Sequence, residues 1–215
     1  MSLDSLERGI EYIRWSLFIV SADASTLVLL LLLSLFVSSF AAYIFTVVLA
    51  YFLLVSTVVP YVIIAILWLL GFRNLARYSR RYFIGFIGSL ITVVSYFMNV
   101  TYMGYLIINE LVGNTLVPQP LFLEPIILAY SRYFIVFSLY LPLPLFASFI
   151  LGIIGSILSM LVLYRLGNDF NSPGSRRSAL VSIIGLLAME FPLVGGLLIS
   201  IGSAFLAINL GSIKT

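Results

Sequence analysis

Two acidic residues, Asp23 and Glu190, stand within long apolar stretches of this 215-residue chain. An ionisable side chain at the bilayer centre costs roughly 2.5–3.5 kcal/mol on insertion scales, and such residues commonly serve ion or proton pathways. Both residues are therefore candidate ion or proton sites. Each also has a structural interpretation, which we favour. Asp23 would cap the first spanning helix by accepting hydrogen bonds from its free N–H groups, and Glu190 would lie in water at a turn.

The residues that the chain lacks narrow the chemistry further. It has no Cys and no His. Disulfides, thiolate metal sites and His-ligated haem or zinc are therefore excluded, and the commonest general base is missing. The single Lys, Lys214, is terminal, which disfavours a Ser–Lys catalytic pair. We predict no catalytic, cofactor-binding or metal site, and we expect the protein not to be an enzyme.

The composition predicts a membrane protein. Apolar residues make up 62% of the chain and charged residues 9%, whereas soluble domains have about 45–50% and about 25%. No soluble fold of this size could bury so much apolar surface. We therefore predict an all-α, polytopic bundle in the cell membrane, with the lipid bilayer as its first partner. The net charge of +3 needs no nucleic acid to explain it.

The chain divides into two predicted parts. Residues 1–22 contain an amphipathic helix: apolar side chains recur at three- and four-residue steps, and charged ones fill the opposite face. We expect this helix to lie in the membrane interface. The alternative is a helix that docks on a soluble domain of a partner. Residues 23–215 form the transmembrane bundle.

We expect six transmembrane helices, with five as the alternative. Four are predicted at about residues 24–38, 42–70, 83–109 and 145–164, with a shorter helix over 126–141. Residues 178–210 decide the count. As one helix they would be about 50 Å long, which exceeds a bilayer core of about 30 Å. As a hairpin they would turn near Glu190 and Pro192, and we favour the hairpin.

Two segments between predicted spans carry seven arginines, which indicates that both face the cytoplasm. With six spans, both termini are then cytoplasmic. In the first segment, residues 72–83, three arginines would share one helical face. In the second, "RLGNDFNSPGSRR", Gly167 suits a helix C-cap and "NSPG" suits a turn. The seven residues are Arg73, Arg77, Arg80, Arg81, Arg165, Arg176 and Arg177, of which Arg73, Arg77 and Arg80 would share the face.

Small residues recur at short steps in the segments "GFIGS", "GIIGS" and "SIGS". Small residues let membrane helices approach closely. We therefore interpret them as helix-packing positions rather than as a ligand site. The glycines concerned are Gly85, Gly88, Gly152, Gly155 and Gly202.

Four short motifs carry a resemblance: "LYRLGNDFN" at 163–171, "SIIG" at 182–185, "VGGLLISIG" at 194–202 and "LERGIEYI" near the N-terminus. Through them the chain, mainly its C-terminal third, resembles multi-pass membrane proteins of unknown function from thermophilic crenarchaea. The resemblance implies archaeal origin and several spans, but no activity and no catalytic residue. Independently, the ten Arg against one Lys and the missing Cys favour a thermophile.

Two functions follow as hypotheses. The first is a structural or accessory subunit of a larger membrane assembly, with other membrane subunits as partners, because the chain offers neither redox ligands nor large loops. The alternative is a small secondary transporter or channel in which Glu190 is the intramembrane acid. A short similarity between "YSRRYFIGF" at Tyr78 and "YSRYFIVF" at Tyr130 would support the alternative if it were an inverted repeat. We favour two independent aromatic–Arg clusters.

Overall fold

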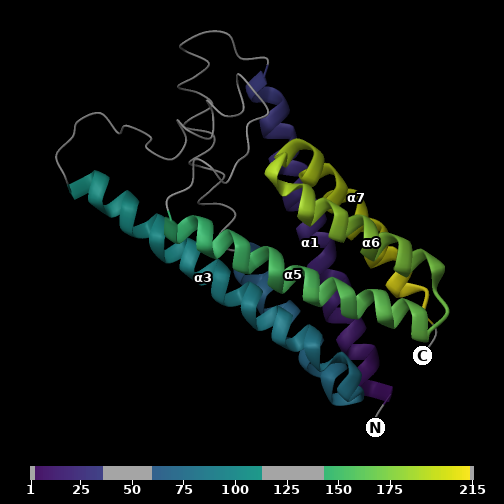
Figure 1. The fold of residues 1–215 in the computed structure, drawn as a ribbon. Coiled ribbons are helices and arrows are strands. Elements are labelled where there is room, and N and C mark those ends of the chain that lie inside the picture. Colours follow the sequence, from purple (N-terminus) through teal and green to yellow (C-terminus); the bar gives the residue numbers. More distant parts are fainter. Residues whose placement is uncertain (1–2, 36–59, 113–142, 214–215) are drawn as a thin grey trace.

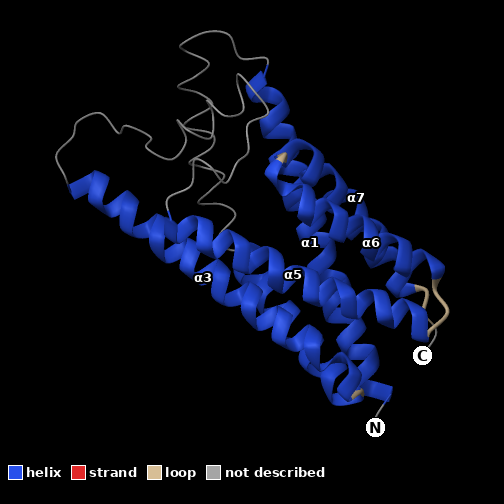
Figure 2. Ribbon diagram, in the orientation of Figure 1, coloured by secondary structure: helices blue, strands red, loops and turns tan. Residues whose placement is uncertain are grey.

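The computed structural model describes residues 3–35, 60–112 and 143–213. This part of the chain is helical apart from short turns (Figures 1 and 2), which confirms the predicted all-α class there. The elements in chain order are α1 (Leu3–Leu35), the helix Pro60–Tyr78, the 3-10 helix η1 (Arg80–Tyr82), α3 (Phe83–Val112), α5 (Leu143–Asp169), α6 (Pro173–Leu187), the 3-10 helix η3 (Ala188–Glu190) and α7 (Pro192–Gly211).

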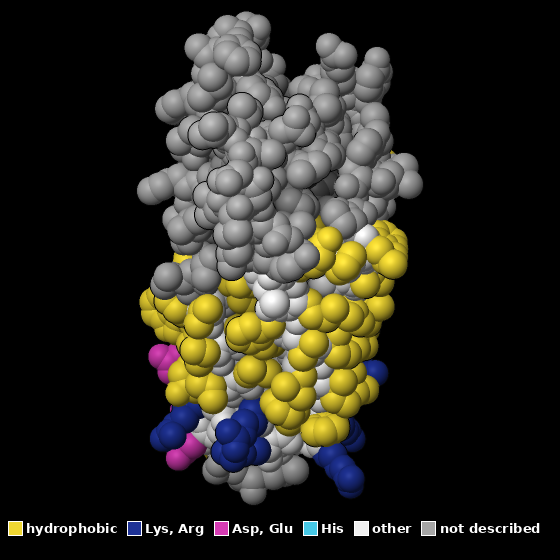
Figure 3. Space-filling model, turned by 90° about the vertical axis from the view of Figure 1, so that its left-hand side faces the viewer, with side chains coloured by type: hydrophobic (Ala, Val, Ile, Leu, Met, Phe, Trp, Pro, Cys, Tyr) yellow, Lys and Arg dark blue, Asp and Glu magenta, His cyan; other side chains and the backbone are white. Residues whose placement is uncertain are grey.

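Four helical stretches of the described chain are long and apolar enough to cross a membrane: Pro60–Tyr78, Arg80–Tyr102, Leu143–Asp169 and Leu193–Gly211. On the face in view in Figure 3, apolar side chains form a broad band, and Arg side chains gather below it at one end. Both features fit a membrane location. The predicted helix over 126–141 and the first part of the second span lie outside the described residues. The count of six spans therefore stays a prediction.

α1 is one unbroken helix from Leu3 to Leu35, about 50 Å long at 1.5 Å per residue. The first span was expected to begin at Ala24, after a cap at Asp23. That cap is wrong, because the chain is helical on both sides of Asp23. A separate interfacial helix is not confirmed either, since the predicted boundary between residues 22 and 23 falls inside α1.

The apolar face of the first turns of α1 explains this continuity. Leu6, Ile13 and Leu17 are fully buried, and they belong to a core cluster formed with the helix Pro60–Tyr78, α5 and α7. The apolar residues whose spacing predicts an amphipathic helix therefore pack against the rest of the bundle. Burial of this face keeps α1 helical through the polar segment "SADAS", whose residues individually favour caps and turns.

The first arginine segment is not a loop. The helix Pro60–Tyr78 continues through Arg73 and Arg77, and only Ser79 separates it from η1. The Ser79 side chain caps the new element by accepting a hydrogen bond of 3.4 Å from the backbone N–H of Arg81. Because the chain turns there, Arg80 does not share a helical face with Arg73 and Arg77, contrary to the prediction.

The second arginine segment contains a tight turn between α5 and α6. Ser172 caps α6, and Asn171 has a left-handed φ of 53°, which Asn adopts more readily than most residues. Gly167 is not the predicted C-cap, because it lies inside α5. A Cβ at Gly167 would lie 3.0 Å from the backbone nitrogen of Arg176. Its small size therefore lets α6 approach α5.

Residues 178–210 form a helical hairpin and not one long helix. α6 ends at Leu187, η3 makes the turn, and α7 begins with Pro192 at a first-turn position that Pro favours. The backbone of Glu190 lies in this turn, at the end of the bundle away from both chain termini (Figure 1). α6 has only 15 residues, fewer than the roughly 20 that cross a bilayer core.

Candidate functional site

Asp23 lies halfway along α1, where its half-buried side chain faces the helix Pro60–Tyr78. The two helices run antiparallel, since Gly9 lies against Gly71 and Asp23 lies against Tyr61. The hydroxyl of Tyr61 makes a side-chain hydrogen bond with the Asp23 carboxyl group. The Tyr61 ring also stacks on Tyr96 of α3, with ring centroids 5.0 Å apart and planes 18° apart. Three helices thus bring one acid and two tyrosines together.

These three residues line a cavity of about 320 Å³ between the helices, which is partly open to the outside. Ligand sites commonly have about 300–1,000 Å³ and occur between the helices of bundles, so this cavity is at the lower end of that range. α1, α3, α5, α6, α7 and the helix Pro60–Tyr78 all contribute to its wall. The polar members of the wall are Asp23, Tyr61, Trp68, Thr92, Ser95, Tyr96, Asn99, Ser156 and Ser182.

Two polar atoms of this wall have no hydrogen-bond partner within the described part of the chain. They are Nε1 of Trp68 and Oγ of Ser182. Trp68 is only 5% exposed and Ser182 is fully buried. Buried polar atoms in proteins are nearly always hydrogen-bonded. In the described structure neither atom is exposed at the cavity surface, and the Ser182 hydroxyl lies against Gly202 of α7, so both are unsatisfied groups behind the wall.

Hydrogen bonds between α3 and α5 fix another part of the cavity wall. The Ser95 hydroxyl donates to the backbone oxygen of Ser148 over 2.6 Å, and the Ser148 hydroxyl donates to Oδ1 of Asn99, also over 2.6 Å. Ser95 and Asn99 both line the cavity. Their side chains are thus held in place before any solute binds.

The five glycines predicted as packing positions all lie at helix contacts. Gly88 of α3 and Gly155 of α5 face each other, because a Cβ on Gly88 would be 2.6 Å from the Gly155 backbone oxygen and a Cβ on Gly155 would be 2.7 Å from that of Gly88. Such close approach of α3 and α5 excludes any larger side chain. Gly85, Gly152 and Gly202 likewise lie against neighbouring helices.

The two predicted acids have different surroundings. Asp23 is the acid that the structure joins to a cavity and to aromatic partners, although a cap seemed the better explanation from sequence. The backbone of Glu190 lies in the η3 turn, which is the placement that we favoured. Among the described residues there is no group of three or more acidic residues that could hold a metal ion.

Four residues of the cavity wall were not predicted from the sequence: Tyr61, Trp68, Tyr96 and Ser182. One signal was present: Tyr61 and Trp68 are seven residues apart, which is about two helical turns and places them on one helix face. That spacing does not show which helix the face contacts. The pairing of Tyr61 with Asp23 depends on tertiary structure, which a single sequence does not reveal.

Comparisons with known proteins add no relative. No protein-family model matches the chain, and neither a curated protein nor a solved structure matches it. The resemblance to crenarchaeal membrane proteins therefore stays a prediction.

Proposed function

We propose that the protein is a small transporter or channel that binds a small cation in the central cavity, with Asp23 as the intramembrane acid. The observation that carries the proposal is the position of Asp23, in the middle of a helix and in the wall of a 320 Å³ cavity. Acids within membrane bundles face cavities or partners and mark solute and ion pathways. Asp23 takes the role that the sequence analysis gave to Glu190.

The residues around Asp23 suit a positively charged solute. The carboxyl group supplies the opposite charge, and the Tyr61 hydroxyl orients it by hydrogen bonding. The rings of Tyr61 and Tyr96 stand beside it, and aromatic rings attract cations through their faces. The oxygens of Ser95 and Asn99 offer further acceptors around the cavity.

The hypothesis of a subunit in a larger assembly concerns contacts outside this chain. It is compatible with the cavity, because a solute-binding protein can also be a subunit. Of the two hypotheses, the cavity favours a transporter or channel, because a purely structural subunit does not need a solute-sized cavity. We therefore place the transporter or channel first and keep assembly with other membrane proteins as a proposal.

Flux measurements on the full chain in liposomes test the proposal. We expect uptake of at least one of four probes: H⁺, Na⁺, K⁺ or methylammonium. Asp23→Asn should lower that uptake by at least about tenfold, because removing one partner of a desolvated charge pair costs roughly 2–5 kcal/mol. Asp4→Asn is the matched control: it makes the same chemical change on the same helix at an exposed position, and it should leave uptake unchanged.

Two results would contradict the proposal. One is the absence of uptake for all four cations by the folded wild-type chain. The other is unchanged uptake in Asp23→Asn. If Glu190→Gln abolished uptake while Asp23→Asn did not, Glu190 would be the acid instead.

A further inference from the structure

A second hollow lies at the end of the bundle where both chain termini are found, and it shares no described lining residue with the central cavity. Its volume is about 510 Å³, and it lies between the start of α3 and the end of α5. We call it the arginine groove. It is lined by Arg80, Arg81, Tyr82, Phe83, Ile84, Tyr164, Arg165, Asn168 and Asp169.

The two sides of the arginine groove are fixed to each other. Tyr82, which is 3% exposed, donates a hydrogen bond of 2.7 Å from its hydroxyl to Oδ2 of Asp169. This bond joins η1, which carries Arg80 and Arg81, to Asp169 at the end of α5, one turn beyond Arg165. The three arginines therefore extend from anchored backbone and not from a loop.

The charge in the arginine groove is strongly positive. Three guanidinium groups line it, and within the described chain none of them makes a hydrogen bond or an ion pair. Asp169 is the one acidic residue among the described lining residues, and it already accepts the Tyr82 hydrogen bond. Guanidinium groups bind phosphate oxygens in bidentate fashion. The N-terminus of α3, which begins at the groove, adds further positive potential.

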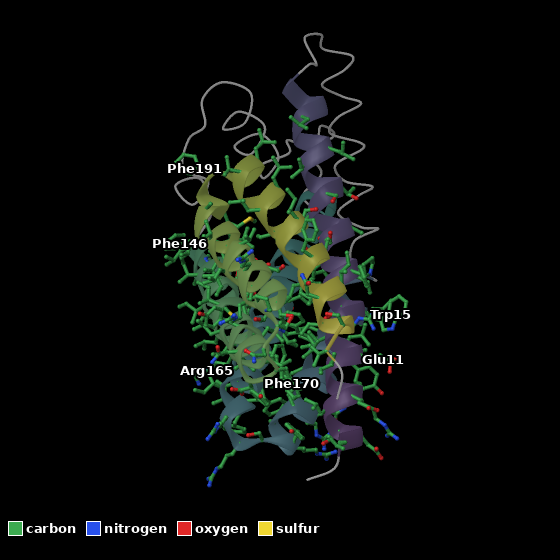
Figure 4. All side chains as sticks on the ribbon, turned by 90° about the vertical axis from the view of Figure 1, so that its right-hand side faces the viewer. Glu11, Trp15, Phe146, Arg165, Phe170 and Phe191 are labelled. Atoms are coloured by element: carbon green, nitrogen blue, oxygen red, sulfur yellow. The ribbon has the colours of Figure 1, made fainter. Side chains whose placement is uncertain are left out.

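Apolar surface continues from the groove along both helices. On α3, exposed apolar side chains follow at steps of three and four residues and so form one stripe, made of Phe83, Ile87, Leu90, Val94 and Phe97. On α5, a second stripe of Leu161, Ile154, Ile150 and Phe146 leads away from Arg165. Figure 4 shows Arg165 and Phe146 on the outer side of the bundle, with Arg165 nearer the end that holds the termini.

We propose that the arginine groove binds the phosphate of an anionic membrane lipid, whose acyl chains lie along the apolar stripes of α3 and α5. A free phosphate ion would satisfy the three arginines but would leave the stripes unused. A lipid with a phosphate headgroup matches both parts. The site is independent of the cavity at Asp23 and of the cation proposed to bind there.

Lipid binding to the purified full chain tests this assignment. Native mass spectrometry would measure the affinity for phosphatidylglycerol and for phosphatidylcholine, and inorganic phosphate would serve as competitor. We expect tighter binding of phosphatidylglycerol. The triple variant Arg80→Gln/Arg81→Gln/Arg165→Gln should lose roughly fivefold in affinity for each arginine removed, in line with the attraction of anionic lipid for each basic residue near a membrane surface.

The control removes the same charge from the same end of the molecule. Arg73, Arg77 and Arg177 are exposed but do not line the groove. The variant Arg73→Gln/Arg77→Gln/Arg177→Gln should keep the wild-type affinity for phosphatidylglycerol. Circular dichroism would establish that both triple variants are folded. If the groove variant does not fold, the single change Arg165→Gln at an exposed position should still weaken binding by about fivefold.

Two outcomes would overturn the proposal. Equal losses in the two triple variants would show diffuse attraction between a basic surface and anionic lipid, with no defined site. Release of bound phosphatidylglycerol by an equal concentration of inorganic phosphate would show a site for the free ion, because the acyl chains would then contribute nothing.

Discussion

At the scale of single residues, the contact between Gly88 and Gly155 determines how closely α3 and α5 approach. Each glycine lies against the backbone oxygen of the other, so an added methyl group would meet backbone and not a movable side chain. Close helix contacts of this kind drive association in membranes, where lipid removes most of the hydrophobic driving force between helices. The cavity wall at Ser95 and Asn99 depends on the same pair of helices.

Gly88→Ala should therefore destabilise the bundle. We expect a loss of roughly 1–3 kcal/mol in the free energy of unfolding, as for other overpacked contacts, and a lower midpoint of thermal unfolding in detergent. Val94→Ile is the control, because it also adds one carbon to α3 but at a side chain that is 54% exposed. Its midpoint should equal that of the wild type. Equal midpoints for all three proteins would mean that α3 and α5 do not touch at Gly88.

Asp23 shows how far sequence reasoning reaches at this scale. An acid within an apolar chain is visible in the sequence, and so Asp23 was a candidate site residue. Its flanking serines made a helix cap the favoured explanation, yet α1 passes straight through them. A residue can cap a helix only at its first turn. Because Leu6, Ile13 and Leu17 are buried in the bundle, α1 already begins at Leu3, and Asp23 lies in its interior. Tertiary packing thus decides the role of Asp23.

At the scale of elements, α1 and α7 pack antiparallel along most of the length of α7. Near the end of α7, Nε of Arg14 donates a hydrogen bond of 3.2 Å to the backbone oxygen of Ala207. Further along, the Ser21 hydroxyl donates to the backbone oxygen of Ser200 over 2.9 Å, and the hydroxyls of Ser25 and Ser200 are 2.6 Å apart. The guanidinium group of Arg14 and the hydroxyls of three serines therefore join α1 to α7 by hydrogen bonds.

Arg14→Met should weaken this attachment. The guanidinium group lies at the C-terminal end of α7, where a cation interacts favourably with the helix dipole and the last carbonyl groups. We expect a loss of about 1–2 kcal/mol in the free energy of unfolding, measured by thermal unfolding in detergent. Arg8→Met provides the comparison, since Arg8 is exposed on the same helix. A loss as large in Arg8→Met would argue against a specific role of Arg14.

The existence of most helices was predictable, but their ends were not. Apolar runs predicted helices over 83–109 and 145–164, and α3 and α5 contain both. The arginine segments were expected to follow the ends of two spans, at about residues 70 and 164. Instead, helix continues through Arg73, Arg77 and Arg165, because a long charged side chain can extend outward from a helix without ending it. Gly167 was predicted to end a helix, because glycine suits the C-cap position. Its lack of a side chain instead allows α6 to approach α5 closely.

At the scale of the whole molecule, the structure places the two chain termini at one end of the bundle and the α6–α7 turn at the other (Figure 1). Basic side chains gather at the end with the termini (Figure 3). The sequence predicted that the two arginine segments share a side, from the count of spans and from the preference of basic residues for the cytoplasm.

The orientation of the molecule in the membrane can be measured with single cysteines, because the chain contains none of its own. We expect Arg177→Cys and Ser212→Cys, both at exposed positions of the end with the termini, to react with an impermeant maleimide in inverted vesicles and not in intact cells. Phe191→Cys, next to the α6–α7 turn and 45% exposed in the native residue, should react in intact cells. The parent chain without cysteine should stay unlabelled in both preparations.

If Phe191→Cys reacted from the same side as Ser212→Cys, the short helix α6 and α7 would form a hairpin that re-enters the membrane without crossing it. The cytoplasmic assignment would be wrong if Arg177→Cys and Ser212→Cys reacted in intact cells, and the basic end of the bundle would then face outward.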